Sequence, residues 1–169
     1  MARRELEFGD CVQTLYERMT HGGFLVNTVG ADGVPNTMTV GWAWFGHGYH
    51  GRPMMVVPIK PERYTFQLIN AVPEYVVSVP TPELAEAVAY CGRASGRDGD
   101  KFKAAGLTPI PSMHVRPPSI AECPINIECR IYHVERPPHG LLTPEHRREP
   151  AERQHWIYFA EVLGVYAGP

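Results

Sequence analysis

Short apolar segments, interrupted by proline and glycine, recur along the whole chain. Four of them are rich in β-branched or aromatic residues or are continuously apolar, which favours β-strands: residues 24–30, 53–59, 74–80 and 155–166. The 17 prolines and 16 glycines keep these segments short and leave room for few long helices. Many short strands bounded by turn residues are typical of a β-barrel or β-sandwich. We therefore predict a mainly β protein.

Residues 31–33, Ala-Asp-Gly, form a hairpin signal, and residues 36–45 are predicted to be the partner strand. Alternation divides this strand into a face of larger side chains and a face of small ones: Met38, Val40 and Trp42 against Thr37, Thr39 and Gly41. The small face either leaves room for a flat ring close to the strand or is the outward face of a half-buried strand. The pattern alone leaves both interpretations open.

Residues 123–135 predict a long strand that is apolar on one face and polar on the other. Cys123 and Cys129 share the apolar face, where we expect them to be buried. They lie too far apart along one strand to form a disulfide.

Three segments predict helices: residues 10–21, residues 61–70 and a segment that opens at Thr81. The third helix ends at Cys91, whose side chain is expected to face inward. Cys91 is then either a small core residue or a contact of a bound group, and its position alone does not choose between them.

The length of 169 residues fits a single domain, residues 1–169, that buries a core of its own. A formal net charge of −2 gives no electrostatic footprint for nucleic acid, and no apolar run approaches the ~20 residues of a membrane-spanning helix. The four cysteines form no C-x-x-C pair, and we expect no metal site. The first residues are polar, so no signal peptide is expected and the predicted location is cytoplasmic.

Residues 91–102, CGRASGRDGDKF, gather glycines and cations in the middle of the chain. Gly96 and Gly99 allow the backbone to turn its N–H groups toward a ligand, while Arg97 and Lys101 add positive charge. The segment therefore predicts a cradle for a phosphate or another small anion. The alternative is a charged loop in which neighbouring aspartates pair with these two cations.

A second candidate anion site lies at the start of the predicted helix 61–70. Lys60, Arg63 and Thr65 would surround the N-terminus of this helix, where free backbone N–H groups favour anions. The competing interpretation is that these residues are ordinary exposed side chains at a helix end and bind no ligand. Residues 136–153, by contrast, are charged and proline-rich, and we expect a mobile excursion or a binding lid there.

Five separated stretches resemble one family: residues 36–42, 63–65, 89–102, 105–109 and 120–124. With these stretches in this order, the chain resembles the flavin reductase-like, FMN-binding split-barrel family, which includes flavoredoxins. The resemblance covers residues 22–166. It implies a Greek-key split β-barrel of antiparallel strands with a few peripheral α-helices. It also implies a homodimer, with FMN bound near the interface.

The resemblance implies roles for three groups of residues. The strand would lie along the isoalloxazine ring through Asn36, Thr37, Met38, Thr39, Gly41 and Trp42. The ribityl phosphate would be approached by Arg63, Tyr64 and Thr65. The remaining phosphate and ring contacts would come from Cys91, Ser95, Gly96, Arg97 and Lys101. The segment from about His139 to Arg153 looks longer and more charged than this family leads us to expect.

The implied activity is that of an oxidoreductase in which FMN takes a hydride from NADH or NADPH. Electrons then pass to free flavin, a ferric chelate or another small acceptor, and no catalytic side chain is required. One alternative is an FMN electron-transfer protein of the flavoredoxin type without a nicotinamide site. Another is a flavin-storing or sensing module whose segment 136–153 binds a partner. Trp42, Trp44 and Phe45 exceed what a small barrel buries, so some of them are expected at the dimer interface.

Overall fold

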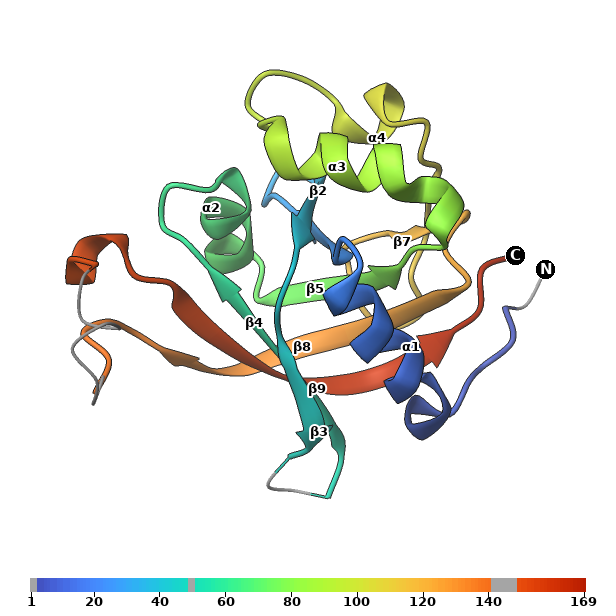
Figure 1. Cartoon of the computed structure of the whole chain (residues 1–169), viewed down its shortest axis with the longest axis horizontal. Helices are drawn as coiled ribbons and strands as arrows, with labels where there is room; N and C mark the ends of the chain where they lie inside the picture. The colour runs from blue at the N-terminus through green and yellow to red at the C-terminus, as the bar shows by residue number, and fades with distance from the viewer. Residues whose placement is uncertain (1–2, 49–50, 141–148) are drawn as a thin grey trace.

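The computed structural model describes residues 3–48, 51–140 and 149–169, and its main element is one antiparallel sheet (Figure 1). Its seven strands follow the order β2-β1-β5-β8-β9-β4-β3. Their bounds are β1 Phe24–Val29, β2 Pro35–Val40, β3 Trp44–His47, β4 Pro53–Ile59, β5 Glu74–Val79, β8 Ile125–Glu135 and β9 Trp156–Tyr166. The prediction of a mainly β protein is confirmed.

Four α-helices and a small second sheet surround the large sheet. The helices are α1 Phe8–Thr20, α2 Tyr64–Ala71, α3 Ala85–Arg93 and α4 Lys101–Ala104. Short 3₁₀ helices span Pro82–Leu84 and Ala151–Arg153, and β6 Pro109–Ile110 pairs with β7 Ser119–Ile120. Figure 1 shows α3 and α4 together beside β2, while α1 lies at a different side of the sheet.

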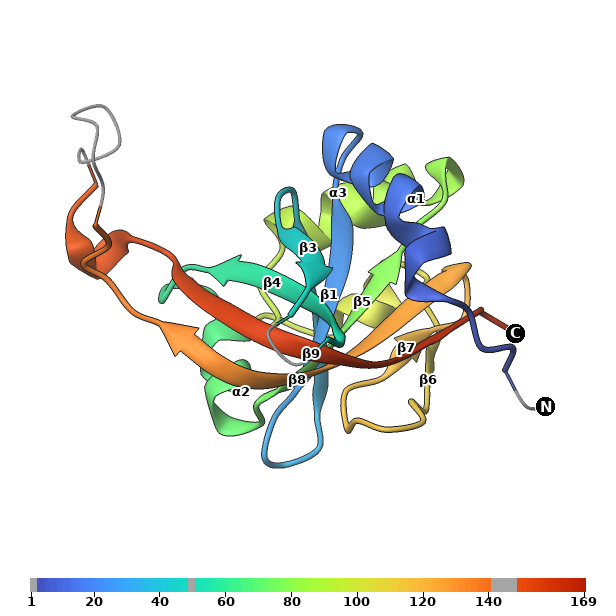
Figure 2. The ribbon, with the colours of Figure 1, turned by 90° about the horizontal axis from the view of Figure 1, so that it is seen from below.

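The two edge strands of the sheet are consecutive in sequence, and this closes the fold. The sequence pattern predicted one strand over residues 36–45, whereas the chain forms β2, which pairs with β1, and β3, which pairs with β4 at the opposite edge. Residues 41–43 join them and span only roughly 10–14 Å. The sheet must therefore curl until its two edges approach one another (Figure 2).

Two apolar cores lie on the two faces of β1. Phe24 and Val26 point into the main core, which also contains Leu15 of α1. Leu25 points the other way, into a second core beneath α3 and α4. This second core consists of Leu25, Val88, Cys91, Phe102, Leu107, Ile120 and Cys123. The helices that carry residues 91–102 are thus anchored on β1 by apolar packing.

The polar face of β8 differs from the simple expectation of a half-exposed strand. Asn126 and Glu128 are both fully buried, because the segment between β6 and β7 covers them. The Asn126 Oδ1 atom accepts hydrogen bonds from Ser78 Oγ at 2.6 Å and from the Ile120 N–H at 2.9 Å. Its Nδ2 donates to the carbonyls of Ile120 and Cys123, each at 3.1 Å. All of its hydrogen-bonding groups therefore have partners.

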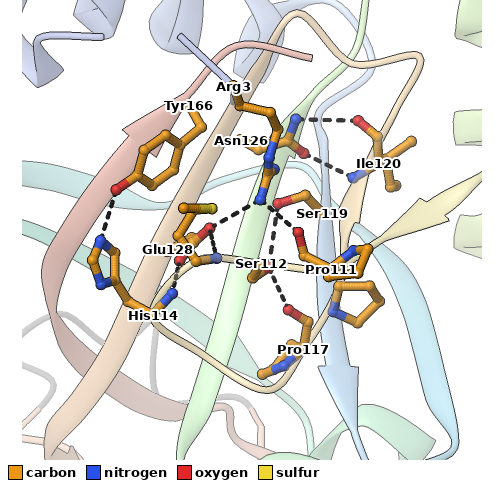
Figure 3. A network of polar contacts seen from close by, with 12 residues as sticks. Arg3, Pro111, Ser112, His114, Pro117, Ser119, Ile120, Asn126, Glu128 and Tyr166 are labelled. Atoms are coloured by element: carbon orange, nitrogen blue, oxygen red, sulfur yellow. Dashed lines mark hydrogen bonds and ion pairs between the residues drawn. The ribbon is translucent and has the colours of Figure 1, made fainter. Parts of the chain in front are cut away.

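Glu128 is the centre of a second buried polar cluster (Figure 3). Its two carboxylate oxygens accept the backbone N–H groups of Met113 at 2.8 Å and His114 at 2.7 Å. Arg3 Nη2 lies 3.6 Å from Glu128 Oε1 and donates to the Pro111 carbonyl at 2.6 Å. His114 Nε2 and the Tyr166 hydroxyl share a hydrogen bond of 2.6 Å. The cluster ties the N-terminal segment and the β6–β7 segment to the sheet.

All four cysteines are buried free thiols, so the expectation that Cys123 and Cys129 form no disulfide is confirmed. None of the helices in the described ranges is long and apolar enough to cross a membrane. Within the same ranges, no group of His, Cys, Asp and Glu residues could hold a metal ion. Residues 141–148, the centre of the charged segment for which we predicted a lid, lie outside the described part of the chain.

Candidate functional site

Two adjoining cavities lie where β2, the start of α2 and the loop after α3 meet. The first, the α2–α3 cavity, has a volume of about 140 Å³, and the second, the β2 cavity, about 180 Å³. Four residues line both of them: Met38, Glu62, Arg63 and Gly92. Most of the site residues predicted from sequence line one or both, although they come from three separate parts of the chain.

The α2–α3 cavity is bordered by the N-terminus of α2. This helix begins at Tyr64, later than the predicted Pro61, and Arg63 is its N-cap residue. No side chain caps this end, and its first turn contains no acidic residue. Unpaired N–H groups and the helix dipole both favour an anion at such an end. The lining residues Arg63, Tyr64 and Thr65 are thus part of a site with positive potential.

Asn36 and Gly96 approach each other closely at the wall of this cavity. Asn36 Nδ2 donates to Thr65 Oγ1 at 3.0 Å, while the buried Asn36 Oδ1 has no partner among the described residues. A Cβ added to Gly96 would collide with Asn36 Oδ1 and lie 2.8 Å from Tyr64 Cδ1. Glycine is therefore required at position 96 for space rather than for a left-handed backbone, which is found at Gly99.

Arg97 is held at the rim by contacts on two elements. Its backbone N–H donates to Ser95 Oγ at 3.2 Å, and its Nη1 donates to the Glu62 carbonyl at 3.3 Å. Its guanidinium lies over the Tyr64 ring, 5.1 Å from the centroid. The alternative in which neighbouring aspartates neutralise this segment is not observed, because neither Asp98 nor Asp100 forms an ion pair within the described ranges.

Lys101 lines the same cavity but differs from the predicted point charge. Its side chain is only 5% exposed, and its Nζ donates to the carbonyls of Cys91 at 2.8 Å and Ala94 at 3.1 Å. These contacts tie the end of α3 to the start of α4. Burial lowers the pKa of Lys101, and the nearby charge of Arg63 lowers it further, although Cys91 acts in the opposite direction. Lys101 is thus first of all a structural tether of the loop.

The small face of β2 is partly covered by α3. Thr39 Oγ1 donates to the Val88 carbonyl of α3 at 2.5 Å, and Thr37 is fully buried and lines neither cavity. At the end of the strand, Thr39 and Gly41 line the β2 cavity, which has room for part of a flat ring.

The β2 cavity has an aromatic and cationic lining. Gly41 and Trp42 line one side, Pro58 and Lys60 line another, and His155 completes the wall. The Trp42 and His155 rings meet edge to face with centroids 5.2 Å apart. Sequence reasoning missed His155 and Pro58, because they reach the site only through the pairing of β4 with β9.

Burial and the surrounding charges set the protonation state of His155. Burial lowers its pKa most, Lys60 lowers it further, and Glu149 opposes the shift. Lys60 Nζ itself donates to Glu149 Oε1 at 2.6 Å, and this hydrogen bond lowers the pKa of the Glu149 carboxyl. His155 is consequently a neutral imidazole at neutral pH.

Cys91 lies between the cavity and the second core. It is fully buried, and burial raises the pKa of its thiol, so it is a thiol rather than a thiolate at neutral pH. All the other cysteines are buried in the interior as well. The described structure therefore gives Cys91 the features of a small core residue.

The two cavities fit an elongated ligand with an anionic end and a flat end. An uncapped helix N-terminus with Arg63 and Arg97 lies at one end, and aromatic rings lie at the other. The unpartnered Asn36 Oδ1 and Gly96 lie at the wall of the α2–α3 cavity. FMN has this distribution of groups: a phosphate, a ribityl chain with hydroxyl donors, and a planar ring system.

Comparisons with known proteins agree with this picture. The model of the flavin reductase like domain matches residues 16–169. Uncharacterized proteins of Archaeoglobus fulgidus and Pyrococcus abyssi are 39% and 43% identical over 113 and 81 residues, which are 66% and 47% of this chain. The matches span 62% and 46% of those proteins, so the chain corresponds to less than two thirds of either relative.

Solved structures confirm the predicted split barrel. Flavoredoxin of Desulfovibrio vulgaris (Miyazaki F) is 28% identical, with a TM-score of 0.69 over 85% of this chain and 68% of that one. A Shewanella frigidimarina protein with a split barrel domain shares the fold at 20% identity, with a TM-score of 0.68 over 96% of this chain and 75% of that one.

Proposed function

Since the chain belongs to the flavin reductase like domain family, we propose that it is an FMN-binding oxidoreductase reduced by NADH or NADPH. Its electrons pass to free flavin, a ferric chelate or another small acceptor. The observation that supports this proposal most is the pair of adjoining cavities, one bordered by an uncapped helix N-terminus and the other by aromatic rings.

The residues around the two cavities would contact different parts of the FMN molecule. Arg63, Arg97 and the first amides of α2 hold the phosphate, while Asn36 Oδ1 accepts a hydrogen bond from the ribityl chain. Met38 and Trp42 bound the ring and exclude water from one side of it. When bound, the flavin supplies the chemistry, because it accepts a hydride and releases electrons singly or in pairs.

A comparison of FMN with riboflavin tests the phosphate end of this assignment. Riboflavin lacks the phosphate, so a lost phosphate contact weakens FMN alone. A charge-assisted hydrogen bond contributes about 1.5–3 kcal/mol, so Arg97→Ala and Arg63→Ala should each weaken FMN roughly 10- to 150-fold. Riboflavin affinity should change little in either variant.

Arg52→Ala is the matched control for this titration, because Arg52 is an exposed arginine whose only ion pair is with Glu161 among the described residues. It should bind both flavins like the parent protein. Equal losses for FMN and riboflavin in the Arg97 and Arg63 variants would mean that these side chains support the fold rather than bind a phosphate.

Anaerobic reduction separates an enzyme from an electron carrier. The 28% identity to a flavoredoxin supports the alternative of an FMN electron-transfer protein without its own nicotinamide site. Rapid mixing of the FMN-loaded protein with NADH or NADPH should bleach the flavin absorbance if the enzyme proposal holds. A flavin that stays oxidised with both donors, yet is reduced by dithionite, supports the carrier instead.

A homodimer is the assembly that we propose, and the outer face of β3, β4 and β9 is its interface. A mostly apolar hollow of about 440 Å³ lies on this face, lined by Trp44, Met54, Val56, Glu135, Ile157 and Phe159. Trp44 is 49% exposed, whereas Phe45 packs against the main core. A second copy would cover both this apolar face and the unpaired edge of β3.

Sedimentation at micromolar concentration tests the dimer. The parent should sediment as a dimer, and Trp44→Glu should shift it to the monomer, because a charge in an apolar interface loses its water without gaining a partner. Tyr16→Glu is the control, since Tyr16 is an exposed aromatic residue of α1 away from this face. A parent protein that sediments as a monomer refutes this part of the proposal.

A further inference from the structure

A third cavity lies beside the flavin site, between the end of α1 and the start of α3. This α1–α3 cavity has a volume of about 490 Å³, within the range of about 300–1,000 Å³ that is usual for small-molecule sites. It is larger than either of the two cavities assigned to the flavin. Of the site residues predicted from sequence, Thr39 alone lines this cavity.

The α1–α3 cavity adjoins the two flavin cavities, with which it shares lining residues. Thr39 and Gly92 line it together with the β2 cavity, and Gly92 and Arg93 line it together with the α2–α3 cavity. The hydrogen bond from Thr39 Oγ1 to the Val88 carbonyl fixes the shared wall in place. Gly92 has no side chain to separate the cavities. A ligand in this cavity would therefore lie next to the flavin.

The lining of the cavity combines an apolar surface with two arginines. Its apolar part is formed by Pro80, Pro82, Ala85, Val88 and Ala89. Arg18 of α1 and Arg93 of α3 lie on its wall, and in the described part of the chain neither takes part in an ion pair. Glu83 is the nearby acid: a hydrogen bond with Thr81 is the main cause of its lowered pKa, and the charge of Arg18 lowers that pKa as well, although Glu83 and Arg18 form no ion pair within the described residues.

This combination favours a ligand that has both a flat apolar body and a negative charge. An apolar wall favours a flat hydrocarbon body, because burial of apolar surface is favourable by about 25 cal/mol per Å². A guanidinium presents paired donors that match the two oxygens of a carboxylate. A neutral apolar compound would leave the arginines unused, and a small inorganic anion would leave the apolar wall uncovered.

We propose that the α1–α3 cavity binds a planar organic anion of the aromatic carboxylate class, with its carboxylate on Arg18 and its ring against α3. That this ligand lies next to a flavin rests on the proposed function. Binding of the anion itself does not.

Calorimetric titration with 2-naphthoate and its uncharged analogue 2-naphthamide tests the site in both the FMN-free and the FMN-loaded protein. The acid should bind roughly tenfold tighter than the amide, which is the factor expected for one charge-assisted contact. Arg18→Ala should abolish this difference. Ala89→Trp fills the cavity without changing the charge, and should weaken both compounds at least tenfold.

Two controls make the result specific. Glu17→Gln alters the neighbouring exposed position of α1 and should bind naphthoate like the parent. FMN affinity should be unchanged in Arg18→Ala, because Arg18 lines neither flavin cavity. Circular dichroism of each variant confirms that it is folded.

Several outcomes overturn the inference. Naphthoate that fails to bind at millimolar concentration does so, as does an affinity that Arg18→Ala and Ala89→Trp leave unchanged. Binding of NAD⁺ in place of naphthoate, with dependence on Arg18, also overturns it, since the occupant is then a dinucleotide. A protein that binds naphthoate but not FMN refutes the proposed function alone. One that binds FMN but not naphthoate refutes only this inference.

Discussion

Two polar regions of this protein are built in opposite ways. In the cluster around Glu128, a fully buried carboxylate receives two backbone N–H groups and an arginine, so its oxygens are satisfied by the protein itself. In the α2–α3 cavity, Asn36 Oδ1 is buried without a partner in the described structure and the first turn of α2 is uncapped.

The difference separates stability from function. A buried polar group without a partner costs about 1–3 kcal/mol, whereas a satisfied group can be neutral or stabilising. Changes in the Glu128 cluster should therefore act on folding, and changes in the cavity should act on ligand binding. Arg3 Nη1 is a partial exception, because it too lacks a partner among the described residues.

The largest effect is expected from Glu128→Gln. This change leaves Arg3 without its anionic partner and places an amide donor against the backbone N–H groups of Met113 and His114. Removal of one partner from a buried ion pair typically costs about 3–5 kcal/mol. Urea unfolding should show this loss, while FMN binds the folded variant with the affinity of the parent.

Glu17→Gln provides the baseline for that measurement, because Glu17 is an exposed residue whose carboxylate accepts a hydrogen bond from Gln13 Nε2. Its replacement should change the free energy of unfolding little. If Glu128→Gln is as stable as Glu17→Gln, the satisfied cluster does not stabilise the fold and the comparison between the two regions fails.

Lys101→Met should give the next largest effect, because Lys101 belongs to both kinds of region. Loss of its two hydrogen bonds to the Cys91 and Ala94 carbonyls should reduce the free energy of unfolding by about 1.5–3 kcal/mol. The displaced loop should weaken FMN and riboflavin by the same factor, unlike the change at Arg97. Lys103→Met, at an exposed position of α4, is the control.

That result would be contradicted by a selective loss of FMN affinity with unchanged stability. Lys101 would then be a phosphate contact, as its sequence position suggests, and its hydrogen bonds to the loop carbonyls would be of little energetic importance.

A smaller effect is expected from Gly96→Ala. The added methyl group meets Asn36 Oδ1 and Tyr64 Cδ1, which both lie at the cavity wall, so one of these side chains must move. Overpacking of this kind costs about 1–3 kcal/mol, and FMN affinity should fall roughly tenfold or more. Gly9→Ala, in open space on α1, should leave FMN affinity unchanged and stabilise the helix slightly. Equal FMN affinity in both variants would show that the Asn36 or Tyr64 side chain moves aside at little energetic cost.

The sequence predicted the elements of the fold well where a local pattern decides the structure. The apolar run 53–59 is strand β4, and the alternation in residues 123–135 becomes β8. The pattern could not show that Asn126 and Glu128 are buried, because their cover comes from the segment between β6 and β7. The pattern also predicted β2 and β3 as one strand. They are separate because they pair with different strands, which a local pattern does not contain.

The candidate site was predictable to a similar extent. Glycines and cations in residues 91–102 indicated the first anion site, and the start of the helix predicted over residues 61–70 indicated the second. The convergence of Arg63 with Arg97 followed from the family resemblance rather than from either segment alone. The direction of the Lys101 ammonium and the presence of His155 depend on packing between distant strands. No local pattern contains that information.

The smallest predicted effect is a pH dependence at His155. Its pKa in the folded protein is lowered from the ordinary value of 6.5, chiefly by burial. Below that value the unfolded chain binds the proton more readily, so the free energy of unfolding should decrease as the pH falls from about 7 to 5.5. Above that pH, His155 is neutral in both the folded and the unfolded protein, and its contribution to the free energy of unfolding no longer changes with pH. His155→Gln should therefore show a flatter decline than the parent in FMN-free urea unfolding, whereas exposed His47→Gln should follow the parent. Parallel curves for all three proteins would mean that the β2 cavity leaves His155 as accessible to protons as the unfolded chain does.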